Sequence, residues 1–163
     1  MKKNGFTLIE IVVSIGIISL IILATTGILM NIFKAKTRVN IADVVEKNGS
    51  FALTEIRRNI INSLTRSIVC SESSLTMLGQ DGQSTQIICN EGGVIASSSA
   101  NGVVSLTDDD VTVTGCAGFV SCITPLTEVS KVNVGFGLES GVEEAGVESY
   151  ASKEFEISVT VRD

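Results

Sequence analysis

Few side chains in this sequence have the types and spacing that covalent or acid–base chemistry needs. Histidine is absent from the 163 residues, so neither a Ser-His-Asp nor a Cys-His arrangement is possible. Carboxylates adjoin at Asp108-Asp109-Asp110 and at Glu143-Glu144, but adjacent acids in a polar loop are usually only solvated. Lys131 and Lys153 lie in strand-like surroundings without an S-x-x-K pattern. We therefore expect no enzyme.

Ligand sites have equally weak support. Asp108 and Asp110 form a candidate calcium site because Ca²⁺ takes about six to eight oxygen ligands, but the run lacks the spaced ligands and Gly turn of an EF-hand. Gly92-Gly93 is not followed by the G-K-S/T of a phosphate loop. The single tyrosine, Tyr150, and the lack of tryptophan disfavour a stacking platform for single-stranded nucleic acid. We expect no metal and no cofactor.

Four cysteines remain, Cys70, Cys89, Cys116 and Cys122. An even count in a small domain beyond a membrane anchor predicts two disulfides in an oxidising compartment, with free thiols or a metal as alternatives. The sequence permits three pairings. A hairpin between residues 74–78 and 85–89 would bring Cys70 towards Cys89. We therefore expect that pair, and Cys116 with Cys122 in the short GCAGFVSC loop.

The membrane anchor is the apolar run from Ile11 to Phe33, which contains no charge. As a helix it would extend roughly 35 Å, enough for a hydrocarbon layer of about 30 Å. No A-x-A-like cleavage site follows Phe33, so we expect a retained single-pass span rather than a signal peptide. Basic residues flank both ends and give no clear orientation. The cysteines and the acidic remainder favour an extracytoplasmic C-terminal domain.

Charge is divided unevenly along the chain. Residues 34–66 hold seven Lys/Arg and three Asp/Glu, whereas residues 67–163 hold three basic and fourteen acidic residues. The acidic part disfavours nucleic acid as a partner because phosphate binding needs positive charge. The basic stretch could meet anionic lipid headgroups or simply solvate a helix.

Periodicity predicts an α+β fold. No proline interrupts residues 6–68, so we expect one long helix, softly broken at Gly27 or Gly49. Its second half carries an apolar stripe at helical spacing, which comprises Leu53, Ile56, Ile60, Ile61, Leu64 and Ile68. Short alternating segments follow, and the helix is expected to cover one face of the small antiparallel sheet that they form.

The expected strands are residues 74–78, 85–89, 111–114, 132–138 and 155–161. Gly79-Gln80-Asp81-Gly82 predicts a hairpin turn between the first two. The last two alternate strictly and are expected to be antiparallel neighbours joined by the loop 139–154. The Gly/Ser-rich stretch 92–102 is expected to be a long connection.

Glu10 is a carboxylate at the edge of the apolar run, where an ionisable residue usually has a partner. Within the chain the candidates are poor, because Lys34 would lie about 36 Å away along a helix. If the chain were cut after Gly5, Phe6 would carry a free amine that could pair with Glu10 of another copy, shifted by about 6 Å. A repeated shift of that kind builds a filament, because a heterologous contact that does not close propagates.

KKNGFTLIE followed by an apolar helix resembles the N-terminal signal of type IV prepilins and type II secretion pseudopilins. The resemblance is tight over residues 2–10 and holds in outline to residue 68. It implies cleavage by prepilin peptidase between Gly5 and Phe6, N-methylation of Phe6, and a role for Glu10 in recruitment and pairing with a neighbouring subunit. Gly27 stands where major pilins often carry proline. The distal half looks more like the minor pseudopilin of the J type.

The resemblance implies a pilin-like chain with a leader at 1–5, a transmembrane and filament-core helix at 6–33, its amphipathic continuation at 34–70 and a disulfide-braced headgroup at 71–163. Its expected function is that of a structural subunit, preferably a minor one, of a type IV pilus or pseudopilus. Expected partners are prepilin peptidase, other subunits, an inner-membrane assembly platform and, before assembly, membrane lipid. The alternative is a membrane-anchored extracytoplasmic binding or adhesin module that does not polymerise.

Overall fold

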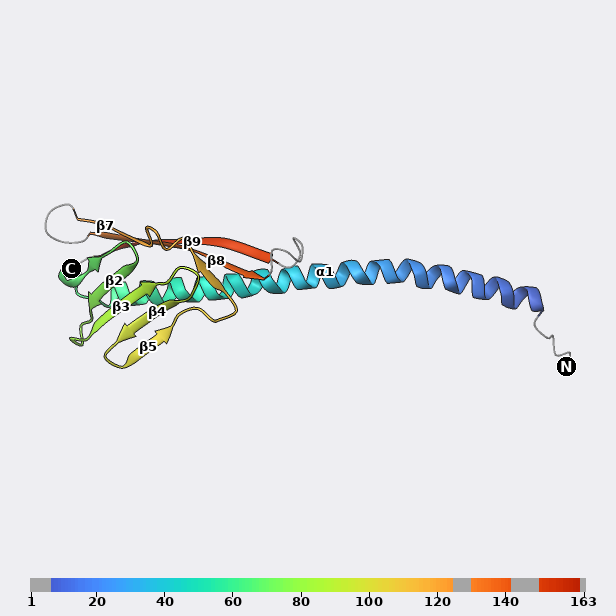
Figure 1. The fold of residues 1–163 in the computed structure, drawn as a ribbon, viewed down its shortest axis with the longest axis horizontal. Helices are drawn as coiled ribbons and strands as arrows, with labels where there is room; N and C mark the ends of the chain where they lie inside the picture. The colour runs from blue at the N-terminus through green and yellow to red at the C-terminus, as the bar shows by residue number, and fades with distance from the viewer. Residues whose placement is uncertain (1–6, 125–129, 142–149, 162–163) are drawn as a thin grey trace. The chain divides into compact units, whose positions relative to one another are not determined.

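The computed structural model describes residues 7–124, 130–141 and 150–161 (Figure 1). The chain divides into two compact units, Met1–Thr37 and Arg38–Asp163. The first contains the N-terminal part of the long helix α1 (Leu8–Ile61). The second, called the headgroup below, contains the rest of α1 and the β-strands of the described residues.

Helix α1 runs through both Gly27 and Gly49 without interruption, so the breaks predicted at these two glycines are wrong. The predicted helix end at residue 68 is also wrong, because α1 ends at Ile61. Polar side chains near this end compete for backbone carbonyls. The Ser63 hydroxyl donates to the carbonyl of Ile60 at 2.7 Å.

Beyond the helix end, the chain makes a short 3-10 turn, η1 (Thr65–Ser67), and enters a sheet. The amide of Leu64 donates to the carbonyl of Leu78 at 2.9 Å, and the amide of Leu78 donates to the Ser67 hydroxyl at 2.9 Å. Leu64 therefore lies outside the helix, and Ile68 is buried from an extended segment rather than from a helical stripe.

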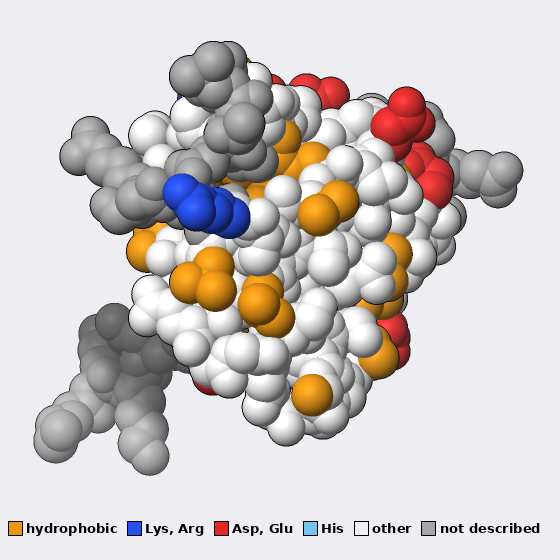
Figure 2. Space-filling view, turned by 90° about the vertical axis from the view of Figure 1, so that its left-hand side faces the viewer, with side chains coloured by type: hydrophobic (Ala, Val, Ile, Leu, Met, Phe, Trp, Pro, Cys, Tyr) orange, Lys and Arg blue, Asp and Glu red, His pale blue; other side chains and the backbone are white. Residues whose placement is uncertain are grey.

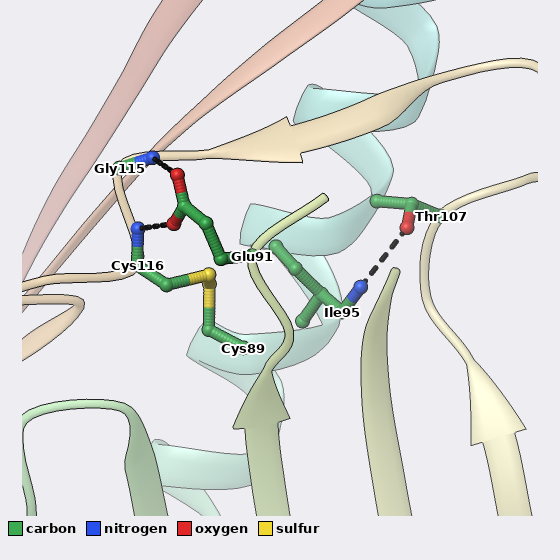
Figure 3. Close-up of a disulfide and its surroundings, with 6 residues drawn as sticks. All are labelled: Cys89, Glu91, Ile95, Thr107, Gly115 and Cys116. Carbon is green, nitrogen blue, oxygen red and sulfur yellow. Dashed lines mark hydrogen bonds between the residues drawn. A yellow bond between two sulfur atoms is a disulfide. The ribbon is translucent and has the colours of Figure 1, made fainter. Parts of the chain in front are cut away.

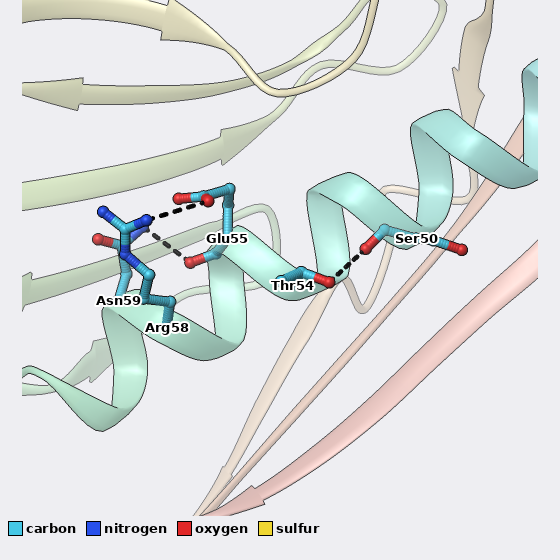
Figure 4. Close-up of polar contacts among 5 residues, drawn as sticks. All are labelled: Ser50, Thr54, Glu55, Arg58 and Asn59. Atoms are coloured by element: carbon cyan, nitrogen blue, oxygen red, sulfur yellow. Dashed lines mark hydrogen bonds and ion pairs between the residues drawn. The ribbon is translucent and has the colours of Figure 1, made fainter.

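The buried residues of α1 all lie in the headgroup and share one side of the helix. They are Val45, Asn48, Gly49, Ala52, Ile56 and Ile60. Ile61 follows Ile60 by about 100° around the helix and is 56% exposed, so its predicted burial is wrong. On the outward side, polar groups bond along the helix itself: the Thr54 hydroxyl donates to the Ser50 carbonyl at 2.7 Å, as Figure 4 shows.

The first sheet is an antiparallel meander of five strands in sequence order. Its strands are β1 (Val69–Cys70), β2 (Ser74–Leu78), β3 (Ser84–Cys89), β4 (Ile95–Ser99) and β5 (Gly102–Ser105). The predicted hairpin is confirmed, since β2 pairs with β3 and the amide of Gly79 donates to the carbonyl of Gln83 across the turn.

The second sheet is centred on β8 (Lys131–Gly141). One side of β8 pairs antiparallel along its whole length with β9 (Tyr150–Thr160). Its other side pairs with β6 (Thr112–Thr114) and β7 (Val120–Ile123), one after the other. The prediction that 132–138 and 155–161 are antiparallel neighbours is confirmed, with Phe136 opposite Phe155. The predicted bounds of the loop 139–154 are wrong, because β8 continues to Gly141 and β9 begins at Tyr150, and residues 142–149 lie outside the described residues.

Four of the described strands, β1, β4, β5 and β7, were not expected from the sequence, and β1 lies in a segment that was predicted to be helical. The stretch 92–102, predicted to be a connection, contains β4 and the first residue of β5, and β7 was also missed. Strand β5 is exposed at every residue, and β4 carries three consecutive serines, so neither shows the alternation that marks a half-buried strand. Pairing to a neighbouring strand, rather than local propensity, makes these segments strands.

One apolar core joins both sheets to α1. Leu75, Met77 and Ile87 of the first sheet and Val132, Val134 and Leu138 of the second belong to the same buried cluster as Ile56 of α1. The architecture is therefore α+β and pilin-like, with a long apolar N-terminal helix packed on antiparallel sheets, as the sequence predicts.

Aromatic packing fixes how the second sheet meets the helix. Phe136 stacks on Phe155 with ring centroids 5.7 Å apart, and Phe119 lies 6.2 Å from Phe136. The ring of Phe155 lies directly against Gly49, where an added Cβ would overlap the ring. Beside it, the ammonium of Lys153 pairs with the carboxylate of Glu46. Gly49 is therefore a packing position and not a helix break.

We predict that Gly49→Ala lowers the free energy of unfolding of the headgroup by about 1–3 kcal/mol, because the new methyl group overpacks against Phe155. This loss is measured by thermal unfolding of the full chain in detergent, with the susceptibility of the headgroup to a protease as the readout. Ser50→Ala, an exposed position on the same helix, is the matched control and should change stability by less than about 0.5 kcal/mol. A Gly49→Ala variant as stable as Ser50→Ala would contradict the packing argument.

Candidate functional site

The N-terminal segment contains the residues that the sequence singled out for maturation and assembly. Gly5 and Phe6 lie outside the described residues, and the description begins with Thr7. The carbonyl of Thr7 accepts the amides of Glu10 and Ile11 at 3.1 and 3.3 Å, so Thr7 occupies the N-cap position of α1. Glu10 is therefore in the first helical turn.

This position gives Glu10 a local physical role that the sequence interpretation missed. The amides of a helix's first turn lack helical partners, and the helix dipole favours a negative charge there. Thr7-Leu8-Ile9-Glu10 also matches the T-x-x-E pattern of a capping box, which could have revealed the helix start. The Glu10 carboxylate makes no hydrogen bond or ion pair within residues 7–124, 130–141 and 150–161. It is thus available to a group from outside the described chain.

The serine and threonine hydroxyls from Ser14 to Thr37 are satisfied by the helix itself. The hydroxyls of Ser14, Ser19 and Thr26 each donate to the carbonyl four residues earlier, at 2.7–2.8 Å. Backbone and hydroxyl groups that bond internally can enter a lipid layer at low cost. Between Leu8 and Phe33, Glu10 is the sole charged residue in the sequence.

The apolar side chains of the same segment are uncovered. Every residue from 7 to 40 is exposed, and Leu8, Leu20 and Leu23 are each about two-thirds or more exposed. By length and composition, α1 is able to cross a membrane, with a mean hydropathy of 2.6 in its most apolar window. An apolar surface of this size needs lipid or other protein around it.

In the headgroup, the four cysteines form two disulfides, but with different partners from those expected. Cys70 of β1 is bonded to Cys122 of β7, and Cys89 of β3 to Cys116. The predicted Cys70–Cys89 and Cys116–Cys122 pairs are therefore wrong. Strand β2 lies between β1 and β3, so these strands are about 10 Å apart, whereas bonded cysteines need Cα atoms within about 7 Å. Both observed bonds instead link the first sheet to the second-sheet region.

A carboxylate reinforces the bond between Cys89 and Cys116 (Figure 3). Glu91 follows β3, and its Oε1 and Oε2 accept the amides of Gly115 and Cys116 at 3.0 and 2.6 Å. Next to it, the amide of Gly92 donates to the carbonyl of Val113 at 2.9 Å. The sequence interpretation did not single out Glu91, and only its position two residues after a cysteine could have drawn attention to it.

The acidic loop that was a candidate calcium site has a structural role through its backbone. The Asp108 amide donates to Asn48 Oδ1 at 2.8 Å, and the Asp110 carbonyl accepts the Ser140 hydroxyl at 2.7 Å. In the part of the chain that the structure describes, no three His, Cys, Asp or Glu side chains gather closely enough to hold a metal ion. Calcium binding by Asp108 and Asp110 stays an untested prediction.

Asn48 is a second functional position that the sequence interpretation missed. It lies within the buried side of α1, donates to the Val44 carbonyl at 3.0 Å, and accepts the Asp108 amide. A polar residue inside an otherwise apolar helical stripe was the available signal.

Residues 1–26 match the prokaryotic N-terminal methylation motif. No curated protein and no solved structure gives a match to the chain. The motif supports a pilin or pseudopilin, implies processing by prepilin peptidase and assembly with other pilins, and points to a structural subunit rather than an enzyme. Together with the apolar part of α1, it fits a single-pass inner-membrane protein. The J-type resemblance has no support from these matches.

We predict that protease digestion without reductant yields peptides that join Cys70 to Cys122 and Cys89 to Cys116. Cys122→Ser should leave Cys70 open to thiol labelling and lower the free energy of unfolding by about 4 kcal/mol, because the bond closes a loop with a sequence separation of 52. Mass spectrometry and thermal unfolding measure the two effects. Labelling of Cys89 in this variant would contradict the assignment.

Proposed function

We propose that this protein is a structural subunit of a type IV pilus or of a type II secretion-like pseudopilus. Prepilin peptidase cuts the chain between Gly5 and Phe6, and the new N-terminus at Phe6 is methylated. The observation that carries the proposal is the methylation motif over residues 1–26, which includes the start of the exposed apolar helix α1.

The four parts of the chain then have distinct tasks. Residues 1–5 are the leader, and residues 6–33 lie in the membrane and later in the filament core. Residues 34–70 continue the chain into the headgroup and supply its helix, and residues 71–163 form the β-rich, disulfide-braced part of the headgroup. The headgroup lies outside the cytoplasmic membrane, where its cysteines are oxidised. An inner-membrane assembly platform draws the subunit from lipid into the filament.

Glu10 pairs with the Phe6 amine of a neighbouring copy or another subunit. Three observations support this role: the carboxylate lies in the first turn of α1, the serine and threonine hydroxyls from Ser14 to Thr37 bond within the helix, and the carboxylate forms no hydrogen bond or ion pair with a described residue. In an apolar bundle, an unpaired carboxylate is costly, so an ammonium partner favours association. When the apolar helices move from lipid into the filament, the favourable free energy comes from side-chain packing, because their apolar surface was not exposed to water before.

A minor subunit is the finer form of the proposal, and it rests on the resemblance of the distal half to J-type pseudopilins. One face of the headgroup favours a protein partner over nucleic acid. Figure 2 shows a headgroup face with mostly uncharged side chains and backbone, small groups of Asp and Glu, and little basic surface. A phosphate backbone needs clustered Lys and Arg.

We predict that Gly5→Val blocks leader removal, because it changes the residue that directly precedes the proposed cut. Intact mass and N-terminal sequencing should show wild-type protein that begins at methylated Phe6, and a variant that begins at Met1. Sheared filaments should lack the variant. If wild-type protein also begins at Met1 in cells that contain prepilin peptidase, the alternative of a non-polymerising membrane-anchored module is favoured.

We predict that Glu10→Lys is processed normally but is incorporated into filaments at least about tenfold less, because two cations then face each other in an apolar bundle. The measurement is the amount of mature protein in sheared filaments relative to the membrane. Glu10→Gln separates charge from size and should also assemble poorly. Normal incorporation of both variants would exclude the proposed pairing.

A further inference from the structure

During oxidation, Cys116 has to form a disulfide with Cys89 rather than with Cys122. Cys116 and Cys122 are near neighbours in sequence, whereas Cys89 and Cys116 are separated by 27 positions. In an unstructured chain, loop closure favours the nearer pair by about tenfold. A Cys116–Cys122 bond would leave Cys70 and Cys89 on strands that β2 keeps apart, so it is a dead end for the native fold.

The geometry around Cys116 favours the more distant partner. Gly115 has a φ of +70°, a left-handed conformation that glycine adopts without strain. This conformation helps to aim the amides of Gly115 and Cys116 at one carboxylate, that of Glu91. Successive amides of this kind form a concave anion-binding nest. Charge-assisted bonds of 3.0 and 2.6 Å hold the Cys116 backbone beside the turn that begins at Cys89 (Figure 3).

The turn that carries Glu91 is itself fixed from both sides. On one side, the Gly92 amide and the Gly93 carbonyl both bond to Val113 of β6. On the other side, the Ile95 amide donates to the hydroxyl of Thr107, which is 2% exposed, at 3.1 Å. The backbone that presents the carboxylate is therefore held by hydrogen bonds that do not involve the sulfur atoms.

We propose that Glu91 and the amide nest at Gly115 and Cys116 direct disulfide formation, by holding Cys116 at Cys89 and away from Cys122. Glu91 is a positioning residue and takes no part in electron transfer. In the reaction, one cysteine thiolate attacks oxidised glutathione, forms a mixed disulfide and releases one glutathione thiolate. The second cysteine thiolate attacks the cysteine sulfur of the mixed disulfide, forms the Cys89–Cys116 bond and displaces the second glutathione thiolate. Two electrons pass from the cysteines to glutathione, and the two protons lost by the cysteine thiols are taken up by the two glutathione thiolates.

The test is oxidative refolding of the full chain in detergent with a glutathione redox buffer, followed by digestion without reductant and quantitative mass spectrometry. Glu91→Gln weakens the acceptor, and Gly115→Ala strains the nest without removing any charge. In both variants we expect the ratio of Cys116–Cys122 to Cys89–Cys116 peptides to rise several-fold, up to the roughly tenfold bias of loop closure.

Two control variants distinguish a specific effect of Glu91 on disulfide pairing from a general loss of headgroup stability. Glu72→Gln changes an exposed carboxylate of the turn between β1 and β2 and should leave the ratio at the wild-type value. Gly49→Ala destabilises the core at Phe155 while leaving Glu91, Gly115 and Cys116 unchanged, and should do the same. A wild-type ratio in both Glu91→Gln and Gly115→Ala would overturn the proposal, as would equal mispairing in Gly49→Ala. None of these outcomes depends on leader cleavage or filament assembly.

Discussion

Two antiparallel sheets that share no strand have to behave as one body, and their common contact with α1 makes this possible. The helix offers a narrow buried side whose middle is occupied by small residues, Gly49 and Ala52. Phe155 of the second sheet fits against Gly49, while Ile56 and Ile60 meet the apolar side chains of the cluster. The rest of the headgroup depends on this arrangement because no strand continues from one sheet to the other.

Covalent bonds and polar contacts lock the sheets at positions away from the helix. Cys70–Cys122 connects edge strands, and Cys89–Cys116, with the carboxylate of Glu91, connects the turn after β3 to the loop after β6. Asn48 adds a polar tie between the helix and the loop at Asp108. The disulfides restrict the unfolded chain, and within the described residues no buried side-chain nitrogen or oxygen lacks a hydrogen-bond partner.

The N-terminal unit differs from the headgroup in that it has no buried core of its own among the described residues. Its side chains are apolar and exposed, and its hydroxyls bond to its own backbone, so it is stable only where lipid or other helices replace water. Glu10 is the exception to this uniform surface. Apolar packing alone would let neighbouring helices slide along each other. In our proposal the pair between Glu10 and the Phe6 amine of a neighbour fixes their axial shift, because the two charged groups meet at one shift only.

The sequence by itself determined the features that depend on local pattern: the apolar helix, the methylation motif, the β2–β3 hairpin and the strictly alternating strands β8 and β9. Periodicity and turn residues act over a few positions, so they are visible without the fold. Tertiary structure decided which cysteines pair, where α1 ends, that β4 and β5 are strands, and that Gly49 is a contact for Phe155. Each of these depends on which segments become neighbours, and the interposition of β2 between Cys70 and Cys89 is a property of strand order that no local pattern records.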